Sequence, residues 1–296
     1  GELLTLELEA ASARLALSGS GRISLTPQAD AELTFRFADA SLDPYVRMLV
    51  PRLSPFATAV ASGTVRVTGE LAEIDQLVVE AEVEELDAEL FDYRVRNDGP
   101  IRLALDRHVV RVDRLRLAGE GTSLDLTGRI DVHARRLDLR ATGDANLGLL
   151  QGFFRDLRSA GAAELAAQIS GPIDRPLLAG TASITGGRIR HFAVPHSLEA
   201  IEGRLSFDTR GVRLDDVTAR VGGGRVQLGG LIGIEGYRIG ELSLTARGEN
   251  MRLRYPEGFQ SLVDADLTLR GTLAAPLLAG TVHVRSAVWR RRFDAA

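Results

Sequence analysis

The chain has 296 residues, 45% of them hydrophobic, and its 36 basic and 40 acidic side chains leave a net charge of −4. Nucleic-acid binding requires a surplus of basic side chains, so DNA and RNA are excluded as partners. The lack of cysteine excludes disulfides, thiolate metal sites and cysteine nucleophiles. No apolar run reaches the ~20 residues needed to span a bilayer, and no signal peptide is recognisable.

Residues 1–68 are expected to form an N-terminal β segment with one short helix. Apolar and polar residues alternate from Leu4 to Leu8, which predicts a strand, and Ser41 precedes a helical spacing of apolar residues at 42–50. The chain opens directly in this strand pattern, and it stops just after another strand. We therefore interpret both ends as cut, so that the segment 1–68 is truncated and the parent protein is longer.

Residues 69–170 are interpreted as a first repeat unit of short amphipathic strands. Leu115 and Leu117 alternate with arginines, and turn residues recur about every eight to twelve positions, which is typical of antiparallel hairpins. A different spacing, with Asn146 as a candidate N-cap, predicts a short helix near 147–158; its apolar stripe comprises Leu147, Leu150, Phe154 and Leu157.

Residues 171–270 are interpreted as a second repeat unit, and residues 271–296 as the truncated start of a third. The hexapeptide Pro-Leu-Leu-Ala-Gly-Thr at 176–181 returns unchanged at 276–281. Residues 208–215 also match 106–113, residues 224–230 match 122–128, and an eroded copy of the turn before the hexapeptide begins at Gly69. Several matches at nearly one offset indicate internal repetition. Together with the alternation, they predict an all-β fold with few short helices.

Several of these segments resemble the translocation-and-assembly-module B (TamB) proteins and their AsmA-like relatives. Residues 201–207 read Ile-Glu-Gly-Arg-Leu-Ser-Phe and are followed by Leu214, Val217, Ala219 and the glycines at 222–224. Further similar stretches are Tyr-Pro-Glu-Gly-Phe at 255–259 and Asp-Ala-Asp-Leu at 264–267. The resemblance extends over residues 165–293 and fades toward the N-terminus.

This resemblance implies an elongated antiparallel sheet curled into a half-pipe with an apolar groove, the β-taco arrangement. It also implies a bacterial periplasmic protein whose inner-membrane anchor lies outside this sequence. Such proteins are associated with carrying phospholipid to the outer membrane and with outer-membrane protein assembly, so an outer-membrane β-barrel assembly protein is a further expected partner. The family contributes no catalytic residues and no cofactor.

The groove candidates are apolar residues that share one parity within neighbouring strands and therefore one face of the sheet. Phospholipid acyl chains would gain about 0.8 kcal/mol per buried CH₂ against such a face. A bulge at Gly222–Gly224 could shift the parity. The candidates are Leu103, Leu105, Leu205, Phe207, Val212, Leu214, Val226 and Leu228.

Other motifs favour structural interpretations. The glycines at 222–224 lack the lysine that a phosphate-binding P-loop requires, so a turn between strands is expected. His191 and His196 do not have the spacing of a zinc site. The Asp215–Asp216 pair is interpreted as a turn, because the matching pair in the earlier repeat is Asp113–Arg114. Arg290–Arg292 beside Trp289 are interpreted as a solvated edge that discourages aggregation.

Two classes of function remain open from the sequence, and neither is enzymatic. The first is a periplasm-spanning scaffold that conducts phospholipid between the membranes or assists outer-membrane protein assembly. The second is a structural β-rich spacer or adhesin stalk without lipid cargo. The two classes differ in whether the apolar side chains are fully buried or line a trough that can receive a ligand.

Overall fold

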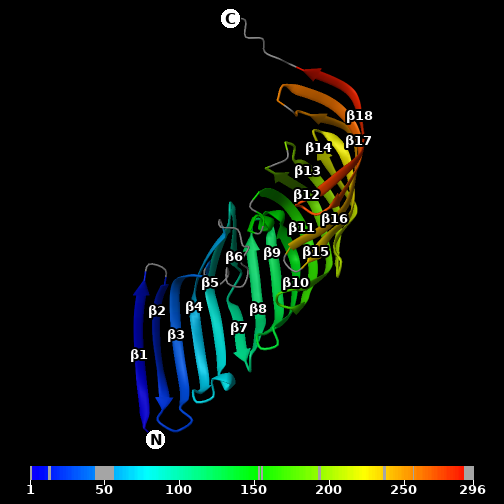
Figure 1. The fold of residues 1–296 in the computed structure, drawn as a ribbon. Helices are drawn as coiled ribbons and strands as arrows, with labels where there is room; N and C mark the ends of the chain where they lie inside the picture. Colours follow the sequence, from blue (N-terminus) through cyan, green and yellow to red (C-terminus); the bar gives the residue numbers. More distant parts are fainter. Residues whose placement is uncertain are drawn as a thin grey trace, which may run out of the picture. The chain divides into compact units, whose positions relative to one another are not determined.

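The computed structural model describes residues 2–12, 15–43, 57–152, 154, 156–192, 195–235, 238–255 and 257–289. Strands account for 79% of the structure and helices for 3%, which confirms the predicted all-β class. The eighteen strands found in the described residues belong to one antiparallel sheet (Figure 1). Tertiary contacts divide the chain into two units, which are described separately below.

The first unit comprises Gly1–Ala145, Gln151–Arg155 and Gln168–Ile173. Each strand pairs with its successor, except that β6 and β7 share the place of one strand between β5 and β8. The strands are β1 (Leu3–Ser12), β2 (Leu15–Ser24), β3 (Asp30–Ser41), β4 (Ala57–Glu70), β5 (Val78–Leu90), β6 (Tyr93–Asn97), β7 (Ile101–Asp106), β8 (Val109–Gly119), β9 (Thr122–Asp131) and β10 (Arg136–Asn146), with a 3₁₀ turn, η1, at Ile74–Gln76.

The second unit comprises Asn146–Leu150, Asp156–Ala167 and Asp174–Ala296. From β12 to β18, every strand pairs antiparallel with the next. The elements are the 3₁₀ helix η2 (Leu147–Gly152), whose last two residues belong to the first unit, β11 (Leu157–Pro172), which contributes to both units, β12 (Leu177–His191), β13 (Leu198–Asp208), β14 (Gly211–Val221), β15 (Gly224–Glu235), β16 (Arg238–Leu253), β17 (Phe259–Gly271) and β18 (Pro276–Trp289).

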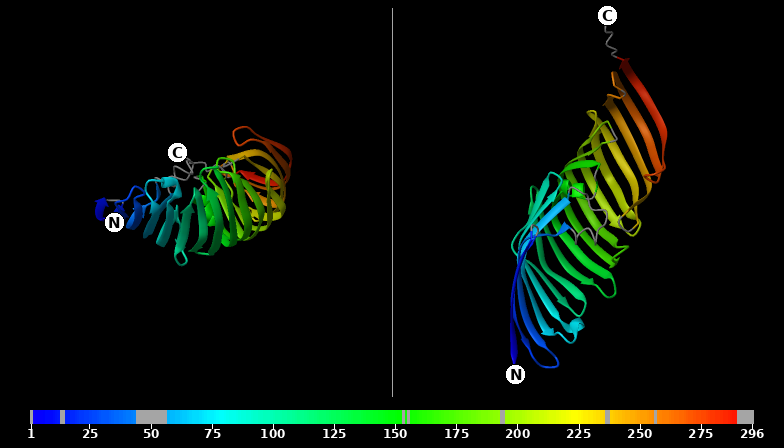
Figure 2. Two further views of the ribbon diagram at one scale, coloured as in Figure 1. Left: turned by 90° about the horizontal axis from the view of Figure 1, so that it is seen from below. Right: turned by 60° about the vertical axis from the view of Figure 1, so that its left-hand side comes forward.

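β-Bulges interrupt the pairing in many strands. The registers require an extra residue in β3, β5, β8, β12, β13, β14, β16 and β18. Such a residue bends its strand and increases the local twist. Within the second unit, β16, β17 and β18 are visibly bent along their length (Figures 1 and 2), as a curled sheet requires.

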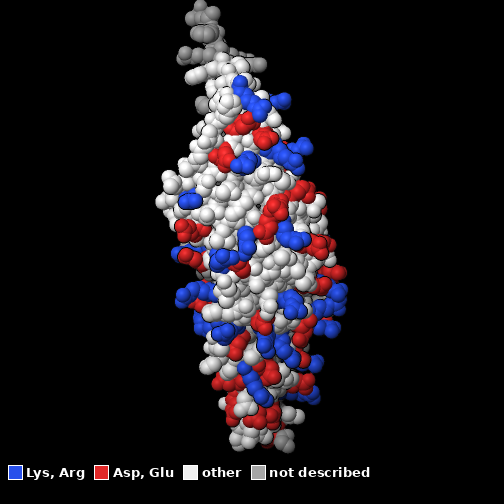
Figure 3. All heavy atoms as spheres, turned by 90° about the vertical axis from the view of Figure 1, so that its right-hand side faces the viewer, with Lys and Arg blue, Asp and Glu red and all other residues white. Residues whose placement is uncertain are grey.

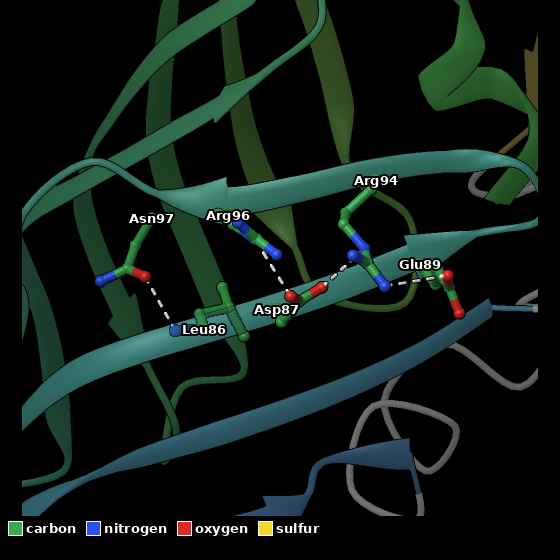
Figure 4. Close-up of polar contacts among 6 residues, drawn as sticks. All are labelled: Leu86, Asp87, Glu89, Arg94, Arg96 and Asn97. Atoms are coloured by element: carbon green, nitrogen blue, oxygen red, sulfur yellow. Dashed lines mark hydrogen bonds and ion pairs between the residues drawn. The ribbon is translucent and has the colours of Figure 1, made fainter.

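Side chains satisfy main-chain N–H groups at or beside four of these bulges. The extra residue of a bulge has no partner in the ladder, so its main-chain N–H group needs another acceptor. The hydrogen bonds, donor first, are Asp39 N to Ser62 Oγ (3.1 Å), Leu86 N to Asn97 Oδ1 (2.8 Å), Gly186 N to Glu202 Oε1 (2.8 Å) and Asn250 N to Asp264 Oδ1 (2.8 Å). Figure 4 shows the bond from Leu86 to Asn97.

The repeated hexapeptide has the same backbone role in both copies. Gly180 and Gly280 have φ values of 139° and 140°. A Cβ atom on either glycine would lie 2.1 Å from a carbonyl oxygen of the neighbouring strand, that of Ala166 or Asp266. Only glycine fits such a position without strain. The repetition seen in the sequence therefore corresponds to a repeated close approach between strands.

The helix predicted near 147–158 is shorter than expected, which corrects that prediction. η2 ends at Gly152, and β11 begins at Leu157. Gly148 and Gly152 lie within the six residues of η2, and glycine disfavours a longer helix by about 1 kcal/mol per residue. The N-cap prediction is confirmed, because Asn146 Oδ1 accepts a hydrogen bond from the N–H of Gly148 at 2.8 Å.

The second predicted helix, near 42–50, lies outside the described residues from residue 44 onward. Neither η1 nor η2 has the length and apolar character that a membrane crossing by a helix demands, and no other helix in the described ranges does.

Candidate apolar cavity on one face of the second unit

One face of the sheet from β12 to β18 is apolar because the strand registers align apolar side chains. Directly opposed residues in an antiparallel pair point to the same face. Leu205 of β13 lies opposite Leu214 of β14, and Phe207 lies opposite Val212. These four predicted groove residues therefore share a face, which is called the apolar face below.

A bulge keeps the apolar residues of β14 on this face. Apolar positions fall on even numbers up to Leu214 but on odd numbers from Val217 onward, and the register shifts between these two residues. Beyond the shift, Val217 lies opposite Leu228, and Ala219 lies opposite Val226. Without the extra residue, a strict period of two would place Val217 and Ala219 on the polar face.

The bulge falls on Asp215–Asp216, which corrects the interpretation of this pair as a turn. Asp216 has a φ of 52°, and the side chain of Asp215 accepts a hydrogen bond from the hydroxyl of Ser206. The turn lies later, at Gly222 and Gly223, whose φ values of 55° and 82° suit the type I′ hairpin between β14 and β15. The expected turn at the glycines is therefore confirmed, and the parity shift precedes it.

A cavity of about 410 Å³ lies on the apolar face of the second unit. This volume is within the ~300–1,000 Å³ that is common for small-molecule sites. No charged side chain lines the cavity, and its residues come from every strand between β12 and β18. They are Ile184, Ile189, Leu198, Ile201, Leu205, Val212, Leu214, Val217, Leu228, Gly229, Ile232, Leu244, Thr245, Ala246, Leu267, Leu269 and Leu278.

The cavity brings together four of the predicted groove residues and leaves out the other four. Leu205, Val212, Leu214 and Leu228 line it. Phe207 shares their face but is not part of the lining, and Val226 is buried beside Met251, Val263 and Ala265. Leu103 and Leu105 lie in the first unit, where β7 pairs them with Val112 and Val110 of β8. A groove along the whole sheet stays a prediction.

Exposure varies strongly across the lining. Ile201 and Val217 each expose 3% of their surface, whereas Leu278 of β18 exposes 62%. β18 is exposed on both of its faces as the last described strand. Within the sheet, Leu205, Leu214 and Leu228 are half-buried, so part of the lining is accessible among the residues that the structure describes. A partly accessible apolar surface of this kind marks a binding site more often than a protein core.

The opposite face of the same strands is polar and carries cross-strand ion pairs. Arg247 Nη2 lies 2.7 Å from Asp266 Oδ2. The Arg210 guanidinium holds the pKa of Asp208 well below its usual range, and Arg213 contributes to the same effect. Basic and acidic side chains are interspersed on the face drawn in Figure 3, so that face has no extended field of one sign.

Asp264 is a carboxylate on this polar face that links its strand to both neighbouring strands. Its Oδ1 accepts the N–H of Asn250 in the β16 bulge, and its Oδ2 lies 2.6 Å from Arg285 Nε. The hydrogen bond from the Asn250 N–H and the ion pair with Arg285 lower the pKa of Asp264 below its ordinary value. This side chain therefore holds the bulge of β16 in place as an ionised group.

The first unit has the same two-faced construction. On the polar face of β5 and β6, Arg94 and Arg96 both contact Asp87, and Arg94 also contacts Glu89 (Figure 4). On the other face, Tyr93 is buried, its hydroxyl donates to the carbonyl of Glu120 at 2.9 Å, and burial raises its pKa. These contacts stabilise strand pairing.

The histidine and tryptophan motifs of the sequence contact neighbouring residues of the fold. His196 Nε2 accepts the main-chain N–H of Arg254 at 3.0 Å. No group of three or more potential metal-ligating side chains occurs within the described ranges. Trp289 packs edge-on against Phe259, with ring centroids 6.5 Å apart, while residues 290–292 lie outside the described residues.

Parity alone missed much of the cavity lining. Ile184 and Ile201 were not predicted as groove residues, because bulges beside them in β12 and β13 change the parity. Leu244, Leu267 and Leu269 belong to alternating segments that a complete parity assignment of β16 and β17 would have found. The useful signal was therefore present in the sequence for the C-terminal strands and hidden by bulges for the earlier ones.

These features define an all-β repeat protein with an amphipathic antiparallel sheet and an apolar cavity on one face. Residues 215–292, from the β14 bulge into the segment after β18, match the family model described as the TamB C-terminal domain. This segment is thus TamB-like, and the resemblance inferred from its motifs is confirmed over it. Searches of curated proteins and of solved structures found no match.

Proposed function

We propose that the apolar cavity binds the acyl chains of phospholipids, and that the protein conducts lipid between the inner and outer bacterial membranes without altering it chemically. The cavity lining carries this proposal, because it contains aliphatic side chains from β12 to β18 and no charged side chain. The match to the TamB C-terminal domain supports the same function. A periplasmic location, with a membrane anchor outside this sequence, is part of the proposal.

The dimensions of the apolar face suit an acyl chain. Seven strands, β12 to β18, at ~4.8 Å per step extend about 29 Å along the sheet. The hydrocarbon core of a bilayer is ~30 Å thick and consists of two acyl layers, so that one acyl layer needs ~15 Å. A chain lying across these strands would gain about 0.8 kcal/mol for each methylene removed from water.

Distributed aliphatic contacts also suit transport better than storage. Leucine, isoleucine and valine dominate the lining, and no aromatic side chain occurs in it. Similar weak contacts on neighbouring strands allow a chain to move stepwise, whereas a single deep pocket would retain it. The polar head group would stay in water, since the lining offers it no charged partner.

Photo-crosslinking tests the proposal directly. A photoreactive amino acid at Leu244 would face the cavity, whereas one at the neighbouring Ser243 would lie on the opposite face of β16. We expect phospholipid adducts from position 244 and none from position 243 in cells that make the full-length protein. Native mass spectrometry of the purified protein should detect the same lipid.

The alternative function is a structural spacer without lipid cargo. In that case neither position would label phospholipid, and the purified protein would carry none. Assistance in outer-membrane protein assembly would instead appear as crosslinks from either position to an outer-membrane β-barrel assembly protein.

A further inference from the structure

The start of η2 lies on the apolar face beside the cavity. Leu147 belongs to a buried cluster with residues of β11, β12, β13 and β14, and Leu150 packs against the same cluster. Leu147 itself exposes only 9% of its surface. The buried members of the cluster are Leu147, Ala163, Ile184, Ile201, Val217 and Ala219.

Polar contacts fix the backbone that carries Leu147. The hydroxyl of Ser159 in β11 donates to the carbonyl oxygen of Leu147 at 2.7 Å, and this serine is buried. Asn146 Oδ1 accepts the N–H of Gly148 at 2.8 Å on the other side of the leucine. Two hydrogen bonds that flank one residue, one of them buried, restrict its movement.

The sheet beneath Leu147 leaves space for its side chain. A Cβ atom on Gly187 of β12 would lie 3.2 Å from Leu147 Cδ1, which is closer than side chains usually approach. Gly187 follows the β12 bulge, whose Gly186 N–H is bound by Glu202. The bulge and the glycine together form a seat for the leucine on the apolar face.

The seat of Leu147 adjoins the proposed lipid site. Ile184, Ile201 and Val217 belong to the cluster around Leu147 and also line the cavity. The same three side chains thus belong both to the buried cluster of Leu147 and to the lining of the cavity. Any ligand that extends from β18 toward β12 along the lining approaches the position of Leu147.

We propose that Leu147 is an end stop that sets how far an acyl chain extends along the apolar face, and hence which chain lengths bind best. This inference rests on the proposed lipid-binding function. A chain bound in the cavity extends or moves past Leu147 only by displacing this side chain, whose backbone is held by Ser159. Methylenes beyond this point stay in water and add no affinity.

The test measures affinity as a function of acyl-chain length. Purified full-length protein is titrated with lysophosphatidylcholines carrying lauroyl, myristoyl, palmitoyl or stearoyl chains, below their micelle concentrations, by displacement of a fluorescent fatty acid. We expect the affinity of the unaltered protein to rise about fourfold per added methylene and then to level off. Leu147→Ala removes three carbon atoms and should move this plateau to longer chains, whereas Leu147→Val should move it less.

Leu231→Ala is the matched control, because Leu231 of β15 lies opposite Arg213 and Ser243 on the other face of the sheet. Its plateau should coincide with that of the unaltered protein. Circular dichroism establishes that each variant is folded, and Leu147→Val decides the outcome if Leu147→Ala does not fold. An unchanged plateau in the folded Leu147 variants would overturn the end stop while leaving lipid binding intact. A folded, unaltered protein that binds no chain would overturn the proposed function itself.

Discussion

A carboxylate at position 228 should weaken lipid binding about one hundredfold while the sheet stays folded. Leu228 is half-buried, lines the cavity and lies opposite Val217 on one side and Ala246 on the other. In the empty cavity, the new side chain of Leu228→Asp can keep water at the accessible side. Lost apolar burial should lower the free energy of unfolding by about 1–3 kcal/mol, which a sheet of this size can absorb.

The cost rises when a lipid covers the carboxylate. An aspartate surrounded by hydrocarbon costs about 2.5–3.5 kcal/mol on membrane-insertion scales. This cost corresponds to an increase of about 60- to 300-fold in the dissociation constant. Because Leu228 is only half-buried, we expect a value of about one hundredfold.

Gln227→Asp provides the control in the same strand. Gln227 is exposed on the polar face, opposite Thr218 and Arg247, so that a carboxylate there gains a cation as its neighbour. Binding of a fluorescent phospholipid and urea unfolding would be measured for both variants. Unaltered affinity in folded Leu228→Asp, or an equal loss in Gln227→Asp, would refute the assignment of the apolar face as the lipid site.

Three further predictions concern the stability of the second unit. Ile201→Ala should lower the free energy of unfolding in urea by about 2–5 kcal/mol and Ile201→Val by about 0.5–1.5 kcal/mol, since this side chain is 3% exposed; equal effects would contradict its burial. Gly280→Ala should lower the free energy of unfolding by about 1–3 kcal/mol, because the φ of Gly280 is 140° and a Cβ atom there would meet a main-chain oxygen. As a control, Gly229→Ala should lower it by less than about 0.5 kcal/mol, because a Cβ atom there would meet only a side-chain hydroxyl. Asp264→Asn should be less stable than the unaltered protein near pH 7, because the carboxylate that accepts the Asn250 N–H has a lowered pKa. Chemical denaturation should show this difference in stability closing as the pH falls below about 4, since protonation removes the stabilisation. A difference independent of pH would exclude this role.

Bulges affect which side chains of a strand lie on the apolar face, as β14 shows. Eight strands carry an extra residue, and each extra residue reverses the parity of all positions that follow it in its strand. In β14 the reversal is matched by the sequence, since the apolar positions also change from even to odd numbers there. The bulge therefore bends β14, and the matching change in the sequence keeps its apolar side chains on one face.

The sequence by itself determined the features that depend on neighbours along the chain. Alternation over a few residues fixes which side chains of a strand share a face, as for Leu205 and Phe207. A single polar side chain fixes the start of η2 at Asn146. The repeated hexapeptide fixes glycines at 180 and 280, where the backbone needs a positive φ. Each of these rests on local sterics or hydrogen bonding that one short segment supplies.

Only the tertiary structure decided how the strands are aligned and where they bend. Ala200, Asp216 and Asn250 adopt positive φ values at bulges, although none is a glycine. The bulge at Asn250 is held by Asp264 from the next strand, fourteen positions away in the sequence. The six residues of η2 received their position from Ser159 and from the space above Gly187. Pairing across strands outweighs the conformational preference of a single residue, and its energy depends on partners that the local sequence does not contain.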